Sequence, residues 1–145
     1  MAVEGFDFSK PSHLARGGII STEWTGQMIV SMKMMEQYHR KAGRIEQAQA
    51  YHDKAAHYEE ELAKLIISSP CPMGHKGWAL PYVSQGNVDT GHGWRTARGA
   101  STGSASGTVY HIFARLGFNP LQLDDNTPRR IVALSHDTTT PTSTP

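Results

Sequence analysis

Apolar residues follow a helical period from about Ser21 onward. Large apolar side chains recur there at steps of three or four: Trp24, Met28, Met32, Met35 and Tyr38. This spacing predicts one apolar stripe along a helix, which we expect to be buried, with Trp24 in the core. Ser21 or Thr22 is suited to cap the start of the helix. The helix is expected to end near Lys41 to Gly43, because a glycine after basic residues is typical of a helix C-terminus.

Two further helices are predicted. The clearest periodicity in the sequence runs from about Ile45 to Ile67 and consists of Ala48, Tyr51, Ala55, Tyr58, Leu62 and Leu65. Only a few residues separate the end of the first helix from the start of the second, so the two helices should form an antiparallel hairpin. A third helix is expected from about Ser104 to Leu116, with one apolar side formed by Val109, Ile112, Phe113 and Leu116. Small residues at its start favour close packing, Gly117 ends it, and Asn119-Pro120 prevents it from resuming.

A long connection, Ser68 to Gly103, separates the second and third helices. Connections of four to six residues are the norm, and longer ones are usually functional or disordered. Aromatic residues such as Trp78, Tyr82 and Trp94 argue against disorder, so we expect an ordered loop. The predicted fold is therefore all-α: an antiparallel helical hairpin plus a third helix after a long ordered loop.

The order of the helices predicts where the chemistry gathers. The first helix leaves one end of the bundle and the second returns to it, so the loop and the start of the third helix must lie there too. That end is expected to contain Glu23, Trp24, His75, Trp78, Tyr82, Asp89, His92, Trp94, Arg95 and Arg98.

Composition indicates one globular domain. The chain has 145 residues, 38% hydrophobic and 19% charged, with a net charge of +1. No segment concentrates Lys and Arg, so we expect no nucleic-acid partner. Cys71 is the single cysteine, which excludes an intrachain disulfide and a cysteine-based zinc site. One tetratricopeptide-like segment, AGRIEQAQAYHDKAAHY, is not an array, and such solenoids need about three repeats.

The two ends of the chain bear on location. No signal peptide is visible at the N-terminus, and no apolar run is long enough to span a membrane, so we expect no membrane partner. The C-terminal HDTTTPTSTP is typical of extended linkers in secreted proteins, which leaves an extracellular origin open. We divide the chain into an N-terminal arm (1–20), a helical domain (21–121) and a C-terminal extension (122–145).

Several phrases resemble the C-terminal part of an (α/α)6 toroid of carbohydrate-active proteins. They are ARGGIISTEWTGQ, YHRKAGRIEQAQAYHDKAAHYEEELAKL, ALPYVSQGNVDTGHGWRTARG and SGTVYHIFARLGFNPL, which span about Ser12 to Leu121. The resemblance implies alternating inner and outer helices, with a sugar-binding cleft at one end walled by long loops and aromatic side chains. A whole toroid is much longer, so the chain resembles a fragment of a glycoside-hydrolase-like protein.

Two carboxylates at the loop end are candidates for catalysis. Glycoside hydrolysis needs an acid and a base or nucleophile about 5 to 9.5 Å apart, and Glu23 and Asp89 are the pair this end offers. Each also has an ordinary interpretation. Glu23 in the first turn offsets the helix dipole, and Asp89 in NVDTG is typical of a turn residue that bonds nearby backbone.

The candidate substrate-binding residues are Trp78, Tyr82, His92, Trp94 and Arg95. Aromatic side chains offer flat, rigid platforms for sugar rings, although they also cover helix ends. Arg95 and Arg98 are suited to bind a carboxylate or sulfate of an acidic sugar, or to bond backbone carbonyls. The spacing of His75, Asp89 and His92 matches no closed metal-ligand set, and GASTGSASG lacks the Gly-Lys-Ser/Thr ending of a phosphate loop. We expect no metal and no cofactor.

The sequence thus supports two hypotheses. The first is a carbohydrate-binding or polysaccharide-processing toroid fragment. The second is a structural or self-assembling helical protein without catalysis. Three helices cannot bury all of the apolar stripes of the first two helices, which would leave larger exposed apolar patches than a monomer normally has. We therefore also predict a homo-oligomer or a tight complex with another chain.

Overall fold

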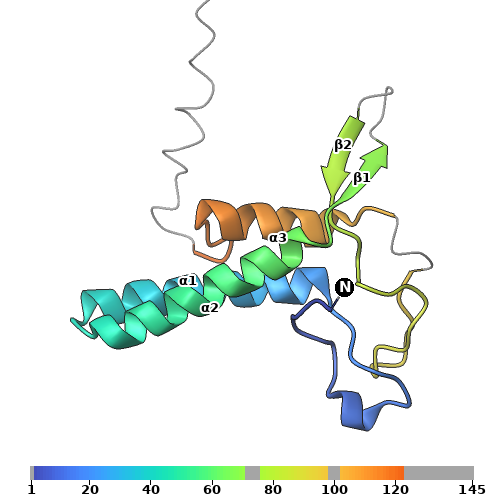
Figure 1. Ribbon diagram of the computed structural model, residues 1–145, viewed down its shortest axis with the longest axis horizontal. Helices are drawn as coiled ribbons and strands as arrows, with labels where there is room; N and C mark the ends of the chain where they lie inside the picture. Colours follow the sequence, from blue (N-terminus) through green and yellow to red (C-terminus); the bar gives the residue numbers. More distant parts are fainter. Residues whose placement is uncertain (1, 71–75, 98–101, 123–145) are drawn as a thin grey trace, which may run out of the picture.

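The computed structural model describes residues 2–70, 76–97 and 102–122. Three α-helices form most of it: α1 (Thr22–Lys41), α2 (Ile45–Ala63) and α3 (Ala105–Leu116). A 3-10 turn (Pro11–His13) lies in the N-terminal arm, and a small antiparallel sheet joins β1 (Ile67–Pro70) to β2 (Lys76–Ala79). The described chain is thus mostly helical, as predicted, and its two-stranded sheet was not predicted (Figure 1).

The end signals predict the start of α1 and the turn between α1 and α2 correctly. Ser21 caps α1, because its hydroxyl accepts the backbone N–H of Trp24. Gly43 reverses the chain with a φ of 72°, a left-handed conformation that favours glycine. The predicted stripe of α2 is confirmed, with Ala48, Ala55 and Leu62 fully buried. The helix ends at Ala63 rather than near Ile67, because the chain turns there and continues into β1.

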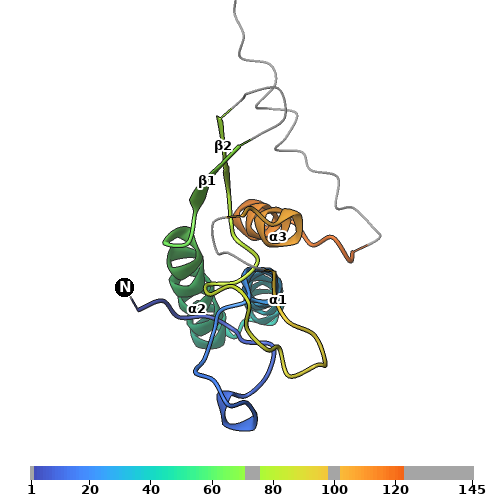
Figure 2. The same cartoon turned by 90° about the vertical axis from the view of Figure 1, so that its right-hand side faces the viewer.

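The predicted stripe of α1 is wrong. Of its five members only Met32 is buried, and Trp24, Met28, Met35 and Tyr38 are exposed. The buried side of α1 consists instead of Thr22, Thr25, Gly26, Ile29, Val30 and Met32. The helix contacts both α2 and α3 (Figure 2). Small residues on α1 allow α3 to approach closely, since a Cβ built on Gly26 would lie only 2.8 Å from Cβ of Tyr110 on α3.

The predicted third helix is confirmed in extent but not in its buried side. Ser104 caps α3, and Gly117 ends it in the left-handed conformation. Its buried residues are Gly107, His111 and Ala114, whereas Val109, Ile112 and Leu116 are exposed. Gly107 allows the contact with α1, because a Cβ there would lie 2.1 Å from Oγ1 of Thr22. The small residues at the start of α3 therefore permit close helix packing, as the sequence suggested.

The hairpin of β1 and β2 replaces the first part of the predicted loop. Ile67 lies opposite Ala79 and Ser68 opposite Trp78. The ribbon extends away from the helices on the far side from the N-terminal arm (Figure 1). Within the described ranges, no helix is long and apolar enough to cross a membrane.

The N-terminal arm packs along the helices. The backbone N–H of Phe6 donates to Oγ1 of Thr25 at 3.0 Å, and its carbonyl accepts from Ser21. The N–H of Glu4 donates to the Glu61 carboxylate on α2. Val3 and Phe6 pack against the main core, where Ile29 and Leu62 are fully buried. The arm thus joins the helical unit through both backbone bonds and apolar contacts.

Candidate functional site

Five aromatic rings gather where α1 begins, and we call this group the aromatic end. Its members come from three segments: Phe8 from the arm, Trp24 from α1, and Tyr82, His92 and Trp94 from the loop after β2. The predicted meeting of the start of α1 with this loop is therefore confirmed for these residues.

Phe8 is the centre of the aromatic end. Its ring centroid lies 5.2 Å from that of Trp24, 5.4 Å from Trp94 and 5.9 Å from Tyr82. The two indoles meet Phe8 edge to face, at 74° and 66°, whereas Tyr82 stacks on it at 28°. These are geometries that aromatic pairs prefer. Because Phe8 is buried, it fixes the orientation of rings that are themselves partly exposed.

Hydrogen bonds to its backbone and to that of Pro81 fix Tyr82 beside the start of α1. Oγ1 of Thr22 donates to the carbonyl of Pro81 at 2.6 Å, and the N–H of Thr22 donates to the carbonyl of Tyr82 at 3.3 Å. Ser84 and Ile20 bond in the same antiparallel fashion, N–H of Ser84 to the carbonyl of Ile20. Thr22 is completely buried, so these bonds are shielded from water and hold the loop firmly.

Residues 87–97 form a tight reversal that presents His92 and Trp94. The N–H of Thr96 donates to the carbonyl of Val88 at 2.9 Å, and Oγ1 of Thr90 donates to the carbonyl of Trp94 at 2.8 Å. At the tip, Gly91 and Gly93 have φ angles of 80° and 82°. Two left-handed residues so close together turn the chain sharply, which is why this segment needs glycine.

The arm holds the tip of this reversal in place. Nε2 of His92 lies 2.8 Å from the carbonyl of Phe8, which makes that nitrogen the donor. Oγ of Ser9 donates to the carbonyl of Thr90 at 3.1 Å, and the Arg16 guanidinium donates to the carbonyl of Asp89. The tip approaches the arm so closely that a Cβ on Gly91 would lie 2.6 Å from Oγ of Ser9.

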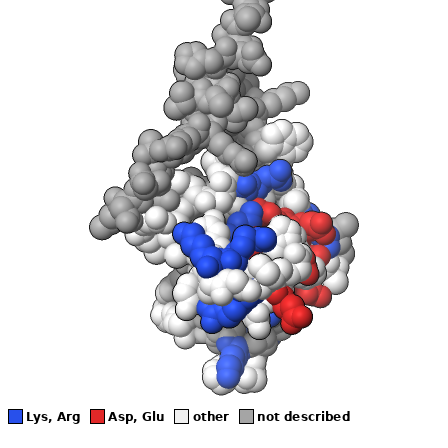
Figure 3. All heavy atoms as spheres, turned by 90° about the vertical axis from the view of Figure 1, so that its left-hand side faces the viewer, with Lys and Arg blue, Asp and Glu red and all other residues white. Residues whose placement is uncertain are grey.

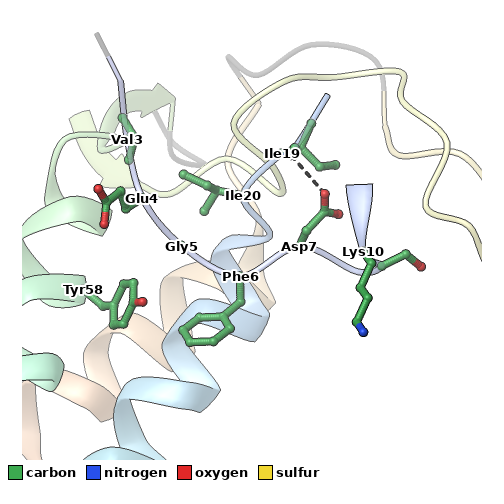
Figure 4. Close-up of a pocket in the computed structure, with 11 residues that line it drawn as sticks. Val3, Glu4, Gly5, Phe6, Asp7, Lys10, Ile19, Ile20 and Tyr58 are labelled. Atoms are coloured by element: carbon green, nitrogen blue, oxygen red, sulfur yellow. Dashed lines mark hydrogen bonds between the residues drawn. The ribbon is translucent and has the colours of Figure 1, made fainter. Parts of the chain in front are cut away.

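An ion pair stiffens the arm itself. Arg16 binds both carboxylate oxygens of Asp7 at 2.8 Å. The N–H of Ile19 donates to the same carboxylate at 3.1 Å, the bond dashed in Figure 4. Burial acts to raise the pKa of Asp7, but the hydrogen bonds from Arg16 and Ile19 and the charge of Arg16 outweigh it. The pKa of Asp7 is consequently lowered, so the arm keeps its ion pair at neutral pH.

The aromatic end is partly open to solvent and has an acidic side. Trp24 is 38% exposed and Trp94 is 42% exposed. The Glu23 carboxylate accepts from Nε2 of Gln27 at 3.2 Å. Burial raises the pKa of Tyr82, and the negative charge of Glu23 adds to the effect. The site therefore combines exposed indole surface, a neutral phenol and a carboxylate acceptor.

Other predicted site residues have different surroundings. Trp78, on β2, is 77% exposed and makes no ring contact with another aromatic residue in the described part of the chain. Arg95 bonds the side-chain and backbone oxygens of Asn87. Asp89 accepts the N–H of Gly91 at 2.9 Å, which is the turn role considered above. His75 and Arg98 lie outside the described residues.

Sequence reasoning missed Phe8, the residue that organises the site. It was assigned only to the arm, since no periodicity links it to residues more than seventy positions later. The only sequence signal is that Phe6 and Phe8, the two aromatic residues of the arm, stand at alternate positions. The alternation does match their different partners, as Phe6 packs on Tyr58 of α2 and Phe8 packs in the aromatic end.

A pocket separate from the aromatic end is formed mainly by the arm. It has a volume of about 540 Å³ and is lined by Val3, Glu4, Gly5, Phe6, Asp7, Ser9, Lys10, Gly18, Ile19, Ile20 and Tyr58 (Figure 4). The carboxylate of Asp7, which lines this pocket, already accepts hydrogen bonds from Arg16 and from the N–H of Ile19. Across the described ranges, no group of three or more His, Cys, Asp or Glu side chains is arranged to hold a metal ion.

Comparisons with protein-family models, with curated proteins and with solved structures find no match for this chain.

Proposed function

We propose that the aromatic end binds carbohydrate. The observation that carries this proposal is the pair of indoles, Trp24 and Trp94, held at defined angles on a buried Phe8 while each leaves about two fifths of its surface exposed. Aromatic surface fixed in this way contacts a sugar ring without losing further side-chain freedom. A resemblance to carbohydrate-active toroids points to the same class of ligand.

Polar groups beside the rings suit the hydroxyls of a sugar. The Glu23 carboxylate is an acceptor in the first turn of α1, next to Trp24, and its negative charge adds to the raised pKa of Tyr82. A few polar groups beside apolar surface are the usual composition of a small-molecule site. We propose a neutral sugar chain as the ligand, because Arg95, one of the two arginines suited to an acidic sugar, bonds Asn87 instead.

We propose binding here and not hydrolysis. A glycosidase needs two carboxylates placed across the scissile bond. Glu23 accepts from the side-chain amide of Gln27, whereas the carboxylate of Asp89 accepts from the backbone N–H of Gly91 and so holds the turn. If the chain has hydrolytic activity, Glu23→Gln should lower it by about 10² to 10⁴-fold, and Asp89→Asn should act mainly by loosening the turn.

Electrophoresis in gels that contain dissolved polysaccharides tests the proposal. The protein should be retarded by at least one member of a panel of neutral glucans, mannans and xylans. Trp94→Ala should weaken that binding by about tenfold or more, as expected for a central aromatic contact.

Trp78→Ala is the matched control. It removes the same side chain from β2, where Trp78 is outside the aromatic end, and it should leave retardation unchanged. Far-ultraviolet circular dichroism should confirm that both variants keep their helices. An equal loss in the two variants, or no retardation by any polysaccharide of the panel, would overturn the proposal.

A further inference from the structure

The side of α1 that faces away from the other helices carries large apolar side chains from Trp24 to Tyr38, with Ser31 between them. We call it the outward face; it consists of Trp24, Met28, Ser31, Met35 and Tyr38. All five residues are exposed. At 100° per residue they lie within an arc of about 80°, and from Trp24 to Tyr38 they cover about 21 Å of helix. This is the stripe whose pattern predicted a core position.

The outward face is opposite the buried side of α1. The fully buried Thr25 and Ile29 lie about 100° and 140° around the helix from Trp24. Figure 2, which looks along the helices, shows α2 beside α1 and α3 above it, so both neighbours occupy the other side. Within the described chain, Met28, Met35 and Tyr38 of the outward face each remain more than a third exposed. Met32, at the border of the face, is buried.

Charged residues of α1 avoid the outward face between its two ends. Lys33 binds Glu59 of α2 and the carbonyl of Ala114 in α3. Glu36 binds Arg40 and His52, and His52 belongs to α2. These side chains therefore serve the contacts within the molecule, and they leave a neutral apolar surface on the other side.

The two remaining charges of α1 have opposite signs and border the outward face at opposite ends. Glu23 lies at the start of the helix and Lys41 at its end. They are eighteen residues apart, which is five whole helical turns, so both lie on one line about 27 Å long. Lys41 has no acidic partner within the described residues, and Glu23 is bonded to the neutral amide of Gln27. Figure 3 shows Lys and Arg side chains at the tip where α1 ends.

We propose that the outward face is a self-association surface and that its occupant is α1 of a second copy of this chain, in antiparallel orientation. A two-fold axis near Ser31 then brings Glu23 of each copy to Lys41 of the other, and both charge pairs form at once. The apolar side chains between them are mutually covered. Methionines are suited to such a surface, because they are flexible enough to fit each other closely.

This inference does not rest on the carbohydrate proposal, although the two surfaces share Trp24 and Glu23. Trp24 ends the outward face and also belongs to the aromatic end, and Glu23 is adjacent to it at the start of α1. Tyr82, His92 and Trp94 come from the loop, so association leaves them at the border of the interface. The oligomeric state is measured without sugar, and a failure here would leave the sugar-binding test unaffected.

Charge reversal tests the proposed orientation. In sedimentation equilibrium at low ionic strength, the unmodified chain should show a concentration-dependent dimer. Glu23→Lys and Lys41→Glu should each weaken self-association by about tenfold, because two attractive pairs become repulsive. An equimolar mixture of the two variants should restore the dimer, since both pairs form again in the mixed species.

Two further variants complete the experiment. Glu60→Lys reverses an exposed charge on α2 and should leave the dimer unchanged. Met35→Asp places a charge in the middle of the outward face and should give a folded monomer. A chain that is monomeric up to its solubility limit would overturn the proposal. So would Met35→Asp dimers, or a mixture that associates no better than its separate components.

Discussion

The helical core and the aromatic end are built in different ways. In the core, apolar side chains interlock: Ile29 of α1 and Leu62 of α2 are fully buried, and glycines let the helices approach each other. At the aromatic end, only Phe8 is buried among the five rings, and the surrounding segments are held by hydrogen bonds between distant backbones. The core is stabilised mainly by the hydrophobic effect. The aromatic end is stabilised by a network of hydrogen bonds that leaves most of its rings partly exposed to solvent.

This difference separates stability from binding. Changes in the core should alter the free energy of unfolding of the whole molecule, because its residues are shared by all helices. Changes at the aromatic end should act on local order and on ligand contact. A binding surface requires such a division, since partly exposed aromatic rings contribute little to the core but need a rigid support.

The largest expected effect is in the core. Leu62→Ala should lower the free energy of unfolding by about 2–5 kcal/mol, because it leaves a cavity under α1 that the helices cannot close completely. Leu116→Ala on α3 is the matched control, since Leu116 is exposed, and it should change stability by about 0.5 kcal/mol or less. Urea denaturation followed by circular dichroism measures both. Similar costs for the two variants would contradict this description of the core.

The next effect concerns the close approach of α1 and α3. Gly26→Ala should destabilise the protein by about 1–3 kcal/mol, because the new methyl group would lie 2.8 Å from Cβ of Tyr110. This cost outweighs the roughly 1 kcal/mol that alanine normally gains over glycine inside a helix. Gly17→Ala in the arm has no neighbouring atom within 4 Å and should be neutral or slightly stabilising. Stabilisation by Gly26→Ala would show that the helices are not so tightly packed.

A third pair of variants separates backbone strain from steric contact at the aromatic end. Gly93→Ala should cost about 1–2 kcal/mol of local stability, because φ is positive there and the space around it is open. Gly91→Ala should cost more, since its methyl group also meets Ser9. Amide hydrogen exchange within residues 87–97 measures the loss. Equal effects would mean that the arm does not hold the tip.

The smallest effect is a dependence on pH in the core. Burial lowers the pKa of His111, and Arg115 and Lys33 add to the shift, whereas Glu59 opposes it. The unfolded chain therefore binds a proton more readily, so stability should fall as pH drops below about 6.5. His111→Gln should remove this part of the loss in urea titrations between pH 7 and 5. The pKa of Asp7 and of Glu36 is lowered too, but their stabilisation is lost only below about pH 4.5.

The sequence predicts features that depend on the pattern within one helix better than features that depend on contacts between distant segments. The stripe of α2 was predicted correctly, because α2 buries one side. The stripe of α1 was assigned to the wrong side, since close packing there selects small residues such as Thr25 and Gly26 and leaves Met28 and Met35 outside. The β1–β2 hairpin was missed because Ser, Pro and Gly interrupt its apolar pattern. The role of Phe8 depends on partners that only the folded chain brings together.

Nuclear magnetic resonance of the three indole N–H groups tests the central claim most directly. The chain contains three tryptophans, so a ¹⁵N-labelled sample gives three indole signals, which Trp→Phe variants assign. Titration with oligosaccharides of the panel should shift the signals of Trp24 and Trp94, with saturation at one shared dissociation constant, and leave Trp78 in place. If Trp78 alone responds, or if no indole signal moves while the sugar binds, the aromatic end is not the carbohydrate site.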